Sequence, residues 1–192
     1  MKKIMFNDRC GLTDAVLEGH KTMTRRIARF NETERPCQKG RDKCLYCKHY
    51  DRENGCEWLL NYSPYKIGEV LAVAQAYKSI PTFDDPRFIY ITPKHKGWSN
   101  KMFVRADLMP HQICIIDIKV ERLQNISDED CMKEGIGYNS EVGFENGCYY
   151  FNDYEGFKTP KSAFCALINR ISGKSTWERN PYVFAYTFEL LK

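Results

Sequence analysis

The apolar and polar residues of this 192-residue chain recur with two periods, one helical and one extended. Leu12, Ala15 and Val16 follow the i, i+3, i+4 spacing of an amphipathic helix, and Gly19 is placed to end it. From residue 22 the period becomes two, as in a strand. This strand pattern predicts a polar wall on one face, made by Thr22, Thr24 and Arg26.

Further apolar runs predict the remaining elements of one domain. The expected strands cover residues 3–6, 70–75, 88–91, 101–105, 113–120 and 182–190, with a hairpin that pairs 142–144 with 149–151. At residues 115–116 the strand 113–120 is expected to be apolar on both of its faces. Ser127 caps a short helix that Gly135 ends, and Thr159-Pro160 opens the longest helix. Many strands, two or three helices and no βαβ order predict an α+β fold, a small mixed β-barrel.

Composition changes this picture in one segment only. The chain is 43% hydrophobic and 14% aromatic, which is typical of a folded globule, and residues 1–192 suit a single domain. Residues 31–64 are charged and lack an apolar period, so they are interpreted as an insertion. The formal charge of +4 permits a nucleic-acid partner without requiring one. The first apolar run ends at Asn7-Asp8-Arg9 and no run is long enough to span a bilayer, which predicts a cytoplasmic protein with no membrane contact.

Four of the nine cysteines lie in the insertion and have a spacing that suits a metal. They predict a structural, tetrahedral zinc site made by Cys37, Cys44, Cys47 and Cys56. Such a site would order a segment too polar to fold by burial alone. Three alternatives stay open: His49 replaces Cys37, the four thiols are free, or two of them form a disulfide. The other five cysteines read as small core residues.

Charged and hydroxyl side chains are most concentrated in residues 19–26, where Lys21, Arg25 and Arg26 lie beside two threonines. Burying unpaired Lys and Arg is expensive, so these groups need anions or water, and a phosphate, a carboxylate or a nucleoside would fit there. Desolvation and the two arginines are expected to lower the pKa of Lys21. Glu134 ends its helix, where its charge opposes the helix dipole by roughly 0.3–1 kcal/mol, and Lys21 or Arg26 would offset that cost.

Two further groups are candidate contacts for a nucleic acid. Trp177 and Asn180 precede the last strand, where they would stack on a base and hydrogen-bond to it. Arg105, Lys101 and His111 surround the Met109-Pro110 turn and are candidate phosphate contacts.

In its motifs the chain resembles the ASCH family of bacteria and phages, whose members are PUA-like β-barrels. The resemblance covers residues 4–190 without the cysteine-rich insertion, and its motifs are Gly19–Arg26, Ile67–Leu71, Glu121–Ser127 with Glu134-Gly135, and Trp177–Phe184. It implies a PUA-like barrel with two or three flanking helices and a cleft at its side that binds RNA or nucleosides. One branch of the family resembles amidohydrolases that remove the acetyl group of N4-acetylcytidine, and its lysine, threonine and glutamate correspond to Lys21, Thr24 and Glu134. Phage-type members usually carry a glutamate where this chain has Gln75.

Three functions follow as hypotheses. The first is binding of RNA or a modified nucleoside by Lys21, Thr24 and Glu134 with the ligand contacts Thr22, Arg25, Arg26, Gln75, Arg105, Trp177 and Asn180. The second is metal-independent hydrolysis of an N-acylated cytidine, in which Lys21 is the base, Thr24 the nucleophile and Glu134 the proton shuttle. The third is a protein-interaction adaptor that works through a zinc-stabilised insertion.

Overall fold

The computed structural model describes residues 1–29, 50–51, 55–80, 86–141, 147–151 and 155–191. The strands in these ranges are β1 (Lys2–Ile4), β2 (Met23–Ile27), β3 (Tyr50–Asp51), β4 (Gly55–Cys56), β5 (Val70–Val73), β6 (Gln112–Arg122), β7 (Gly137–Asn139), β8 (Cys148–Tyr150) and β9 (Tyr182–Leu191). The α-helices are α1 (Leu12–Leu17), α2 (Asp128–Lys133), α3 (Pro160–Ser172) and α4 (Thr176–Arg179). Short 3-10 helices are η1 (Asp8–Cys10), η3 (Glu57–Tyr62), η4 (Tyr77–Ser79), η5 (Pro86–Phe88), η6 (Lys101–Phe103), η7 (Ala106–Leu108) and η8 (Leu123–Asn125).

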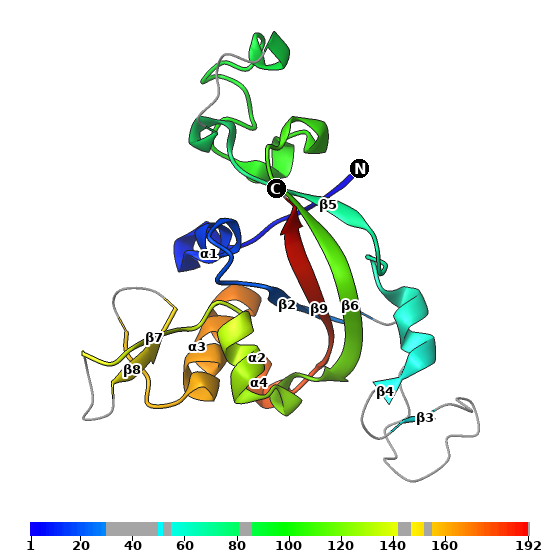
Figure 1. Cartoon of the computed structure of the whole chain (residues 1–192), viewed down its shortest axis with the longest axis vertical. Helices are drawn as coiled ribbons and strands as arrows, with labels where there is room; N and C mark the ends of the chain where they lie inside the picture. The colour runs from blue at the N-terminus through cyan, green and yellow to red at the C-terminus, as the bar shows by residue number, and fades with distance from the viewer. Residues whose placement is uncertain (30–49, 52–54, 81–85, 142–146, 152–154, 192) are drawn as a thin grey trace.

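The centre of the fold is a five-stranded sheet with the order β1-β5-β6-β9-β2. β1 runs parallel to β5, and every other neighbouring pair is antiparallel. β6 and β9 are the two long, curved strands in the middle of Figure 1, and they pair from Gln112↔Leu191 to Arg122↔Tyr182. Their register shifts between Ile115 and Asp117, which leaves Ile115 buried but Ile116 43% exposed. The prediction of two apolar faces at this point was therefore wrong for Ile116.

The two outer strands of the sheet, β1 and β2, are bridged by side chains. Arg26 Nη2 on β2 donates to the carbonyl of Met5, just after β1, at 2.6 Å. The Arg26 guanidinium also lies over the Phe6 ring, 5.7 Å from its centroid. No backbone ladder joins β1 to β2 within the described ranges. The predicted α+β class is confirmed, as a curved five-stranded sheet in which Arg26 spans the gap between the edges.

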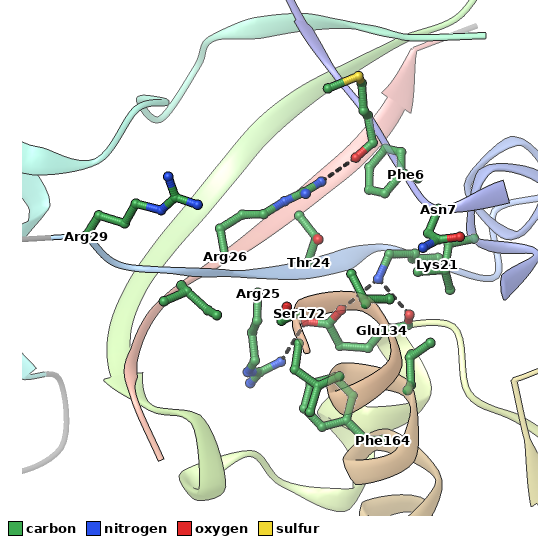
Figure 2. Close-up of a pocket in the computed structure, with 16 residues that line it drawn as sticks. Phe6, Asn7, Lys21, Thr24, Arg25, Arg26, Arg29, Glu134, Phe164 and Ser172 are labelled. Atoms are coloured by element: carbon green, nitrogen blue, oxygen red, sulfur yellow. Dashed lines mark hydrogen bonds and ion pairs between the residues drawn. The ribbon is translucent and has the colours of Figure 1, made fainter. Parts of the chain in front are cut away.

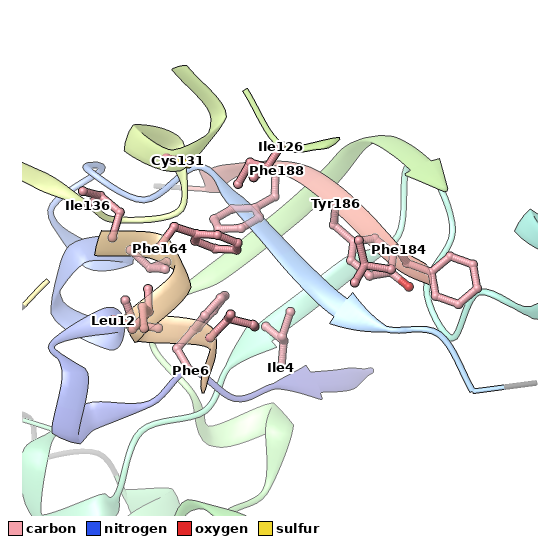
Figure 3. Close-up of a cluster of buried hydrophobic side chains, with 14 of the residues drawn as sticks. Ile4, Phe6, Leu12, Ile126, Cys131, Ile136, Phe164, Phe184, Tyr186 and Phe188 are labelled. Carbon is pink, nitrogen blue, oxygen red and sulfur yellow. The ribbon is translucent and has the colours of Figure 1, made fainter. Parts of the chain in front are cut away.

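Helices cover the end of the sheet near β2, where the main core forms. Figure 1 shows α2, α3 and α4 together beside β2 and β9. α3 buries Ala163, Phe164, Leu167 and Ile168, whereas Ile171 in its last turn is 38% exposed. Its Phe164 ring and that of Phe188 belong to one cluster with Ile4 and Phe6 (Figure 3). The helix thus closes one side of the sheet and supplies an apolar wall.

The predicted helix starts are confirmed by their capping hydrogen bonds. Ser127 Oγ accepts from the Asp130 backbone N–H at 3.1 Å, and Thr159 Oγ1 accepts from that of Ser162 at 3.1 Å. Each bond satisfies one donor of the first turn, which an α-helix cannot satisfy by itself.

Two predicted strands between β5 and β6 were wrong. Residues 88–91 follow η5 as a turn, and residues 101–105 contain η6. Both edges of β5 are already occupied by β1 and β6, so no free edge of that strand is left for these runs. Instead they fold over a second, smaller core around Tyr77, Phe88 and Val104.

The predicted hairpin has a different partner from the one expected. β8 pairs with β7 through Gly137↔Tyr150 and Asn139↔Cys148. Residues 142–146, which include the expected partner strand, lie outside the described ranges. No described helix has both the length and the apolar character needed to cross a bilayer.

Candidate functional site

A cavity of about 460 Å³ lies beside β2, between the segment that follows β1 and the helices α2 and α3 (Figure 2). Five of the predicted site residues line it: Lys21, Thr24, Arg25, Arg26 and Glu134. The other walls come from the segment after β1, from α1, from the end of β2 and from α3, through Met5, Phe6, Asn7, Leu12, Ile27, Arg29, Phe164, Leu167, Ile168, Ile171 and Ser172. The resulting cavity has one charged wall and one apolar wall.

Backbone contacts position Lys21 against Glu134. The Thr22 backbone N–H donates to the carbonyl of Lys133 at 3.0 Å, which docks the start of β2 onto the last turn of α2. Gly135 then leaves α2 with φ +97°, and a side chain at this position would put its Cβ 3.3 Å from Leu12. A glycine is favoured here mainly because L side chains rarely adopt this positive φ.

Lys21 and Glu134 form a buried ion pair, as the helix-dipole argument predicted. Lys21 is 2% exposed, and its Nζ donates to Glu134 Oε2 at 2.7 Å and to the Glu134 carbonyl at 2.6 Å. Burial lowers the pKa of Lys21, and it outweighs the opposing effect of the Glu134 carboxylate. The expected direction of the shift is thus supported, with desolvation as its main cause.

Arg25 is held by three carboxylates from two other elements. Its Nε and Nη2 contact Glu121 Oε1 at 2.8 and 2.6 Å, Nη2 contacts Asp130 Oδ2 at 2.7 Å, and Nη1 contacts Glu134 Oε1 at 3.2 Å. Burial opposes the charge of Arg25, but the Glu134 and Glu121 carboxylates outweigh burial and raise its pKa. Two cations thus face three carboxylates, so Lys21 and Arg25 are neutralised within the protein. The expectation that they hold an external anion is not supported by this geometry.

Arg26 and Thr24 retain hydrogen-bonding capacity toward the cavity. Arg26 Nε is buried and has no hydrogen-bond partner within the described part of the chain. Its Nη2 is used on the Met5 carbonyl, and its charge has no carboxylate partner among those residues. Thr24 is 5% exposed, and no hydrogen bond joins its hydroxyl to another described residue. A buried donor without a partner is costly, so Arg26 Nε is where a ligand would be bound, with the Thr24 hydroxyl in the same cavity as a second polar group.

The remaining predicted ligand contacts do not line this cavity. Gln75 lies under the second core, where its Oε1 is 2.9 Å from His111 Nδ1. Arg105 is exposed and forms a bidentate pair with Asp107. Thr22 is half-buried at the start of β2, and its contacts described here are made by its backbone.

Trp177 and Asn180 have packing roles at the far end of β9. The Trp177 ring meets Phe164 edge to face with the centroids 6.2 Å apart. Asn180 Oδ1 accepts from the Gln124 backbone N–H at 2.9 Å, and the Trp177 carbonyl accepts from Gln124 Nε2 at 2.8 Å. These bonds fix the turn into β9 and leave the two side chains outside the cavity.

Sequence reasoning missed several residues that build the site. Glu121 and Asp130 complete the Arg25 cluster, and Asp130 does so from the acidic first turn of α2. Phe6 lines the cavity, and two cations lie over its ring. Lys21 Nζ is 6.0 Å from the ring centroid, and the Arg26 guanidinium is the second cation. Phe6 comes right after the first predicted strand, but no local signal shows that its ring turns toward Arg26.

The predicted zinc ligands fall outside what the structure describes. Cys37, Cys44 and Cys47 lie in 30–49, and for Cys56 only the backbone in β4 is described. Within the described ranges, no three potential metal ligands cluster together. Zinc in the insertion therefore stays a prediction. The scattered cysteines are free thiols, and burial raises the pKa of Cys131 to about 12, which makes it a poor nucleophile.

Comparisons with family models, with curated proteins and with solved structures found no match to this chain. The function must therefore be argued from the cavity.

Proposed function

We propose that the cavity binds a nucleoside, either free or as an unpaired nucleotide of RNA. The observation that carries this proposal is Arg26 Nε, a buried donor that has no partner among the described residues and belongs to a side chain that lines a cavity of about 460 Å³. A nucleobase has carbonyl oxygens and ring nitrogens that accept such a bond, and flat apolar faces that suit the α3 wall. The volume is within the range of small-molecule sites.

The charge distribution supports a neutral or weakly polar group in the cavity and an anionic group at its rim. Lys21 and Arg25 are already neutralised, whereas Arg29 is exposed where β2 leaves the sheet. In an RNA, the base would enter beside Arg26 and Thr24 and the phosphates would stay near Arg29. We further propose that the curved sheet is a PUA-like barrel of the ASCH type, closed at its seam by Arg26.

Nucleoside binding is tested by calorimetry with cytidine, N4-acetylcytidine and the other nucleosides. Arg26→Met should weaken binding about tenfold or more, because a hydrogen bond to a charged group contributes roughly 1.5–3 kcal/mol. Arg9→Met, which removes an exposed arginine outside the cavity, is the matched control and should bind as wild type does. Thermal melting shows whether the Arg26 variant stays folded, since Arg26 also bridges the sheet edges. Equal affinity of the two variants for every bound nucleoside would contradict the proposal.

Hydrolysis of an N-acylated cytidine is a second candidate, favoured by the fact that Lys21, Thr24 and Glu134 line one cavity. The Thr24 hydroxyl would attack the acyl carbon, and its proton would pass to the departing exocyclic amine. Water would then hydrolyse the acyl ester and release the acid. The lowered pKa of Lys21 suits a base, although its Nζ is bonded to Glu134.

If the protein is a hydrolase, it should convert N4-acetylcytidine to acetate and cytidine. The change in absorbance measures this reaction. Thr24→Val keeps the side-chain shape and removes the nucleophile, so it should reduce the rate to that of the uncatalysed reaction. If wild-type protein binds N4-acetylcytidine and releases no acetate, the cavity is a binding site only.

A further inference from the structure

The segment between β5 and β6 carries a second, chemically distinct surface. Its residues 86–105, here called the basic lobe, contain five cationic residues and no Asp or Glu: Arg87, Lys94, Lys96, Lys101 and Arg105. In Figure 1 this green segment projects past the end of the sheet where both chain termini lie. It takes no part in the five-stranded sheet.

Large apolar side chains are exposed among these cations. Tyr90 is 87% exposed and Ile89 72%, on the turn after η5. Met102 is 65% exposed and Phe103 50%, in η6. The exposed rings of Tyr90 and Phe103 offer faces on which an unpaired base can stack.

The backbone beneath these side chains is held in place. Lys3 Nζ donates to the carbonyls of Met102 and Val104, both at 2.7 Å, which ties η6 to β1. The Arg105 backbone N–H donates to the hydroxyl of Tyr77, which is buried at the centre of the second core. The exposed rings therefore sit on a fixed scaffold.

Two lysines of the basic lobe are available to a ligand, whereas Lys101 is paired with Asp8 and Arg105 with Asp107. Neither Lys94 nor Lys96 forms an ion pair with a residue of the described ranges, and both are exposed. Lys96 Nζ lies over the Phe103 ring, 5.7 Å from its centroid. A ring that carries a neighbouring cation can stack a base while the cation contacts the adjoining phosphate.

We propose that the basic lobe binds single-stranded nucleic acid, with bases stacked on Tyr90 and Phe103 and phosphates on Lys94 and Lys96. Its cationic composition is complementary to a polyanion. A base can stack on one of the exposed rings only if it is not already paired and stacked in a duplex, so the ligand is single-stranded. An anionic membrane is the other polyanionic surface to consider. An amphipathic helix is one common means of lying in a membrane interface, whereas the helical parts of the lobe are two 3-10 turns of three residues each.

The basic lobe also connects to the cavity through Lys101. Its Nζ donates to the Phe6 carbonyl at 2.6 Å, and the Phe6 ring lines the cavity. A strand bound on the lobe would therefore run close to the cavity entrance. The lobe proposal does not depend on the cavity binding a nucleoside.

The experiment measures the affinity of the full chain for a fluorescent 12-nucleotide single-stranded RNA, by anisotropy at several salt concentrations. Phe103→Leu, which keeps the apolar character and removes the ring, should weaken binding about tenfold, as expected for the loss of one stacked base. Tyr90→Phe should bind as wild type does, since it keeps the ring. The double variant Lys94→Gln/Lys96→Gln should lower the slope of log K against log salt by roughly 1.4, because each lost phosphate contact removes about 0.7.

Matched controls separate this surface from general charge and from the cavity. The double variant Lys119→Gln/Lys161→Gln removes two exposed lysines elsewhere and should keep the wild-type slope. Arg26→Met should lose nucleoside affinity, whereas Phe103→Leu should retain it, so failure of either proposal is seen separately. The lobe proposal is overturned if Phe103→Leu binds RNA as tightly as wild type, if duplex RNA of equal length binds as tightly as the single strand, or if only phosphatidylserine vesicles bind.

Discussion

Replacing Glu134 by alanine should destabilise the protein by about 3–5 kcal/mol, because the substitution leaves a buried lysine without its anion. Lys21 is 2% exposed, and Glu134 is the carboxylate that contacts its Nζ. The same substitution removes one of the three carboxylates around Arg25. A loss of this size is a large share of the roughly 5–15 kcal/mol that stabilises a typical domain. Urea unfolding at pH 7 measures it.

The dependence of this loss on pH identifies Lys21 as its cause. Burial already lowers the pKa of Lys21, and removal of Glu134 takes away the largest effect that opposes burial. Between that lowered pKa and about 10.4, the unfolded chain binds a proton that the folded chain does not, so stability rises with pH. Both folded proteins follow this rule, and the Lys21 pKa of the variant is the lower of the two. As pH rises from that value to the Lys21 pKa of folded wild type, the variant gains stability before wild type does, so the deficit of Glu134→Ala should shrink across that window.

An exposed ion pair provides the control for this variant. Glu69 lies 2.9 Å from Lys2 at the surface, and Glu69→Ala should cost less than about 1 kcal/mol. Adding Lys21→Met to Glu134→Ala should recover part of the loss, because no unpaired lysine then remains buried. If Glu134→Ala behaves like Glu69→Ala at every pH, Lys21 reaches solvent and the buried pair is refuted.

The importance of residues 19–26 was predictable from the sequence, but the partners of their cations were not. The helix-dipole argument named Lys21 or Arg26 as the partner of Glu134, and the structure shows that the partner is Lys21. For Arg25 the anions are Glu121 and Asp130, which lie 96 and 105 residues away along the chain. No local pattern connects residues so distant, and only the fold shows that an internal anion takes the place expected for a ligand.

Local signals were reliable for helix ends and less so for short strands. The caps at Ser127 and Thr159 depend on side chains within three residues, and both are confirmed. A strand also needs an edge to pair with, which a sequence does not reveal. The apolar run 88–91 has no such edge, so it buries Phe88 in the second core and exposes Ile89 and Tyr90.

Replacing Arg25 by methionine should also cost at least about 3 kcal/mol at pH 7, but with the opposite dependence on pH. Without the guanidinium, the carboxylates of Glu121, Asp130 and Glu134 face one another, and like charges raise the pKa of such groups. Protonation of a carboxylate relieves this repulsion in the folded variant but not in the unfolded chain, so the folded state takes up protons more readily than the unfolded state. Stability falls as pH rises through the range in which these carboxylates ionise, and acidification should restore part of it.

Urea unfolding of wild type and Arg25→Met at pH 5 and pH 7 tests this prediction, and the deficit should be smaller at pH 5. Arg25→Lys is the matched control. It keeps a positive charge but cannot contact three carboxylates at once, so it should lose less stability and show less recovery in acid. A deficit of Arg25→Met that grows on acidification would mean that the three carboxylates do not share one site. Only the Glu134 variant would then show the pH dependence of stability that is expected from the surroundings of the cation, because Lys21 is paired with a single carboxylate.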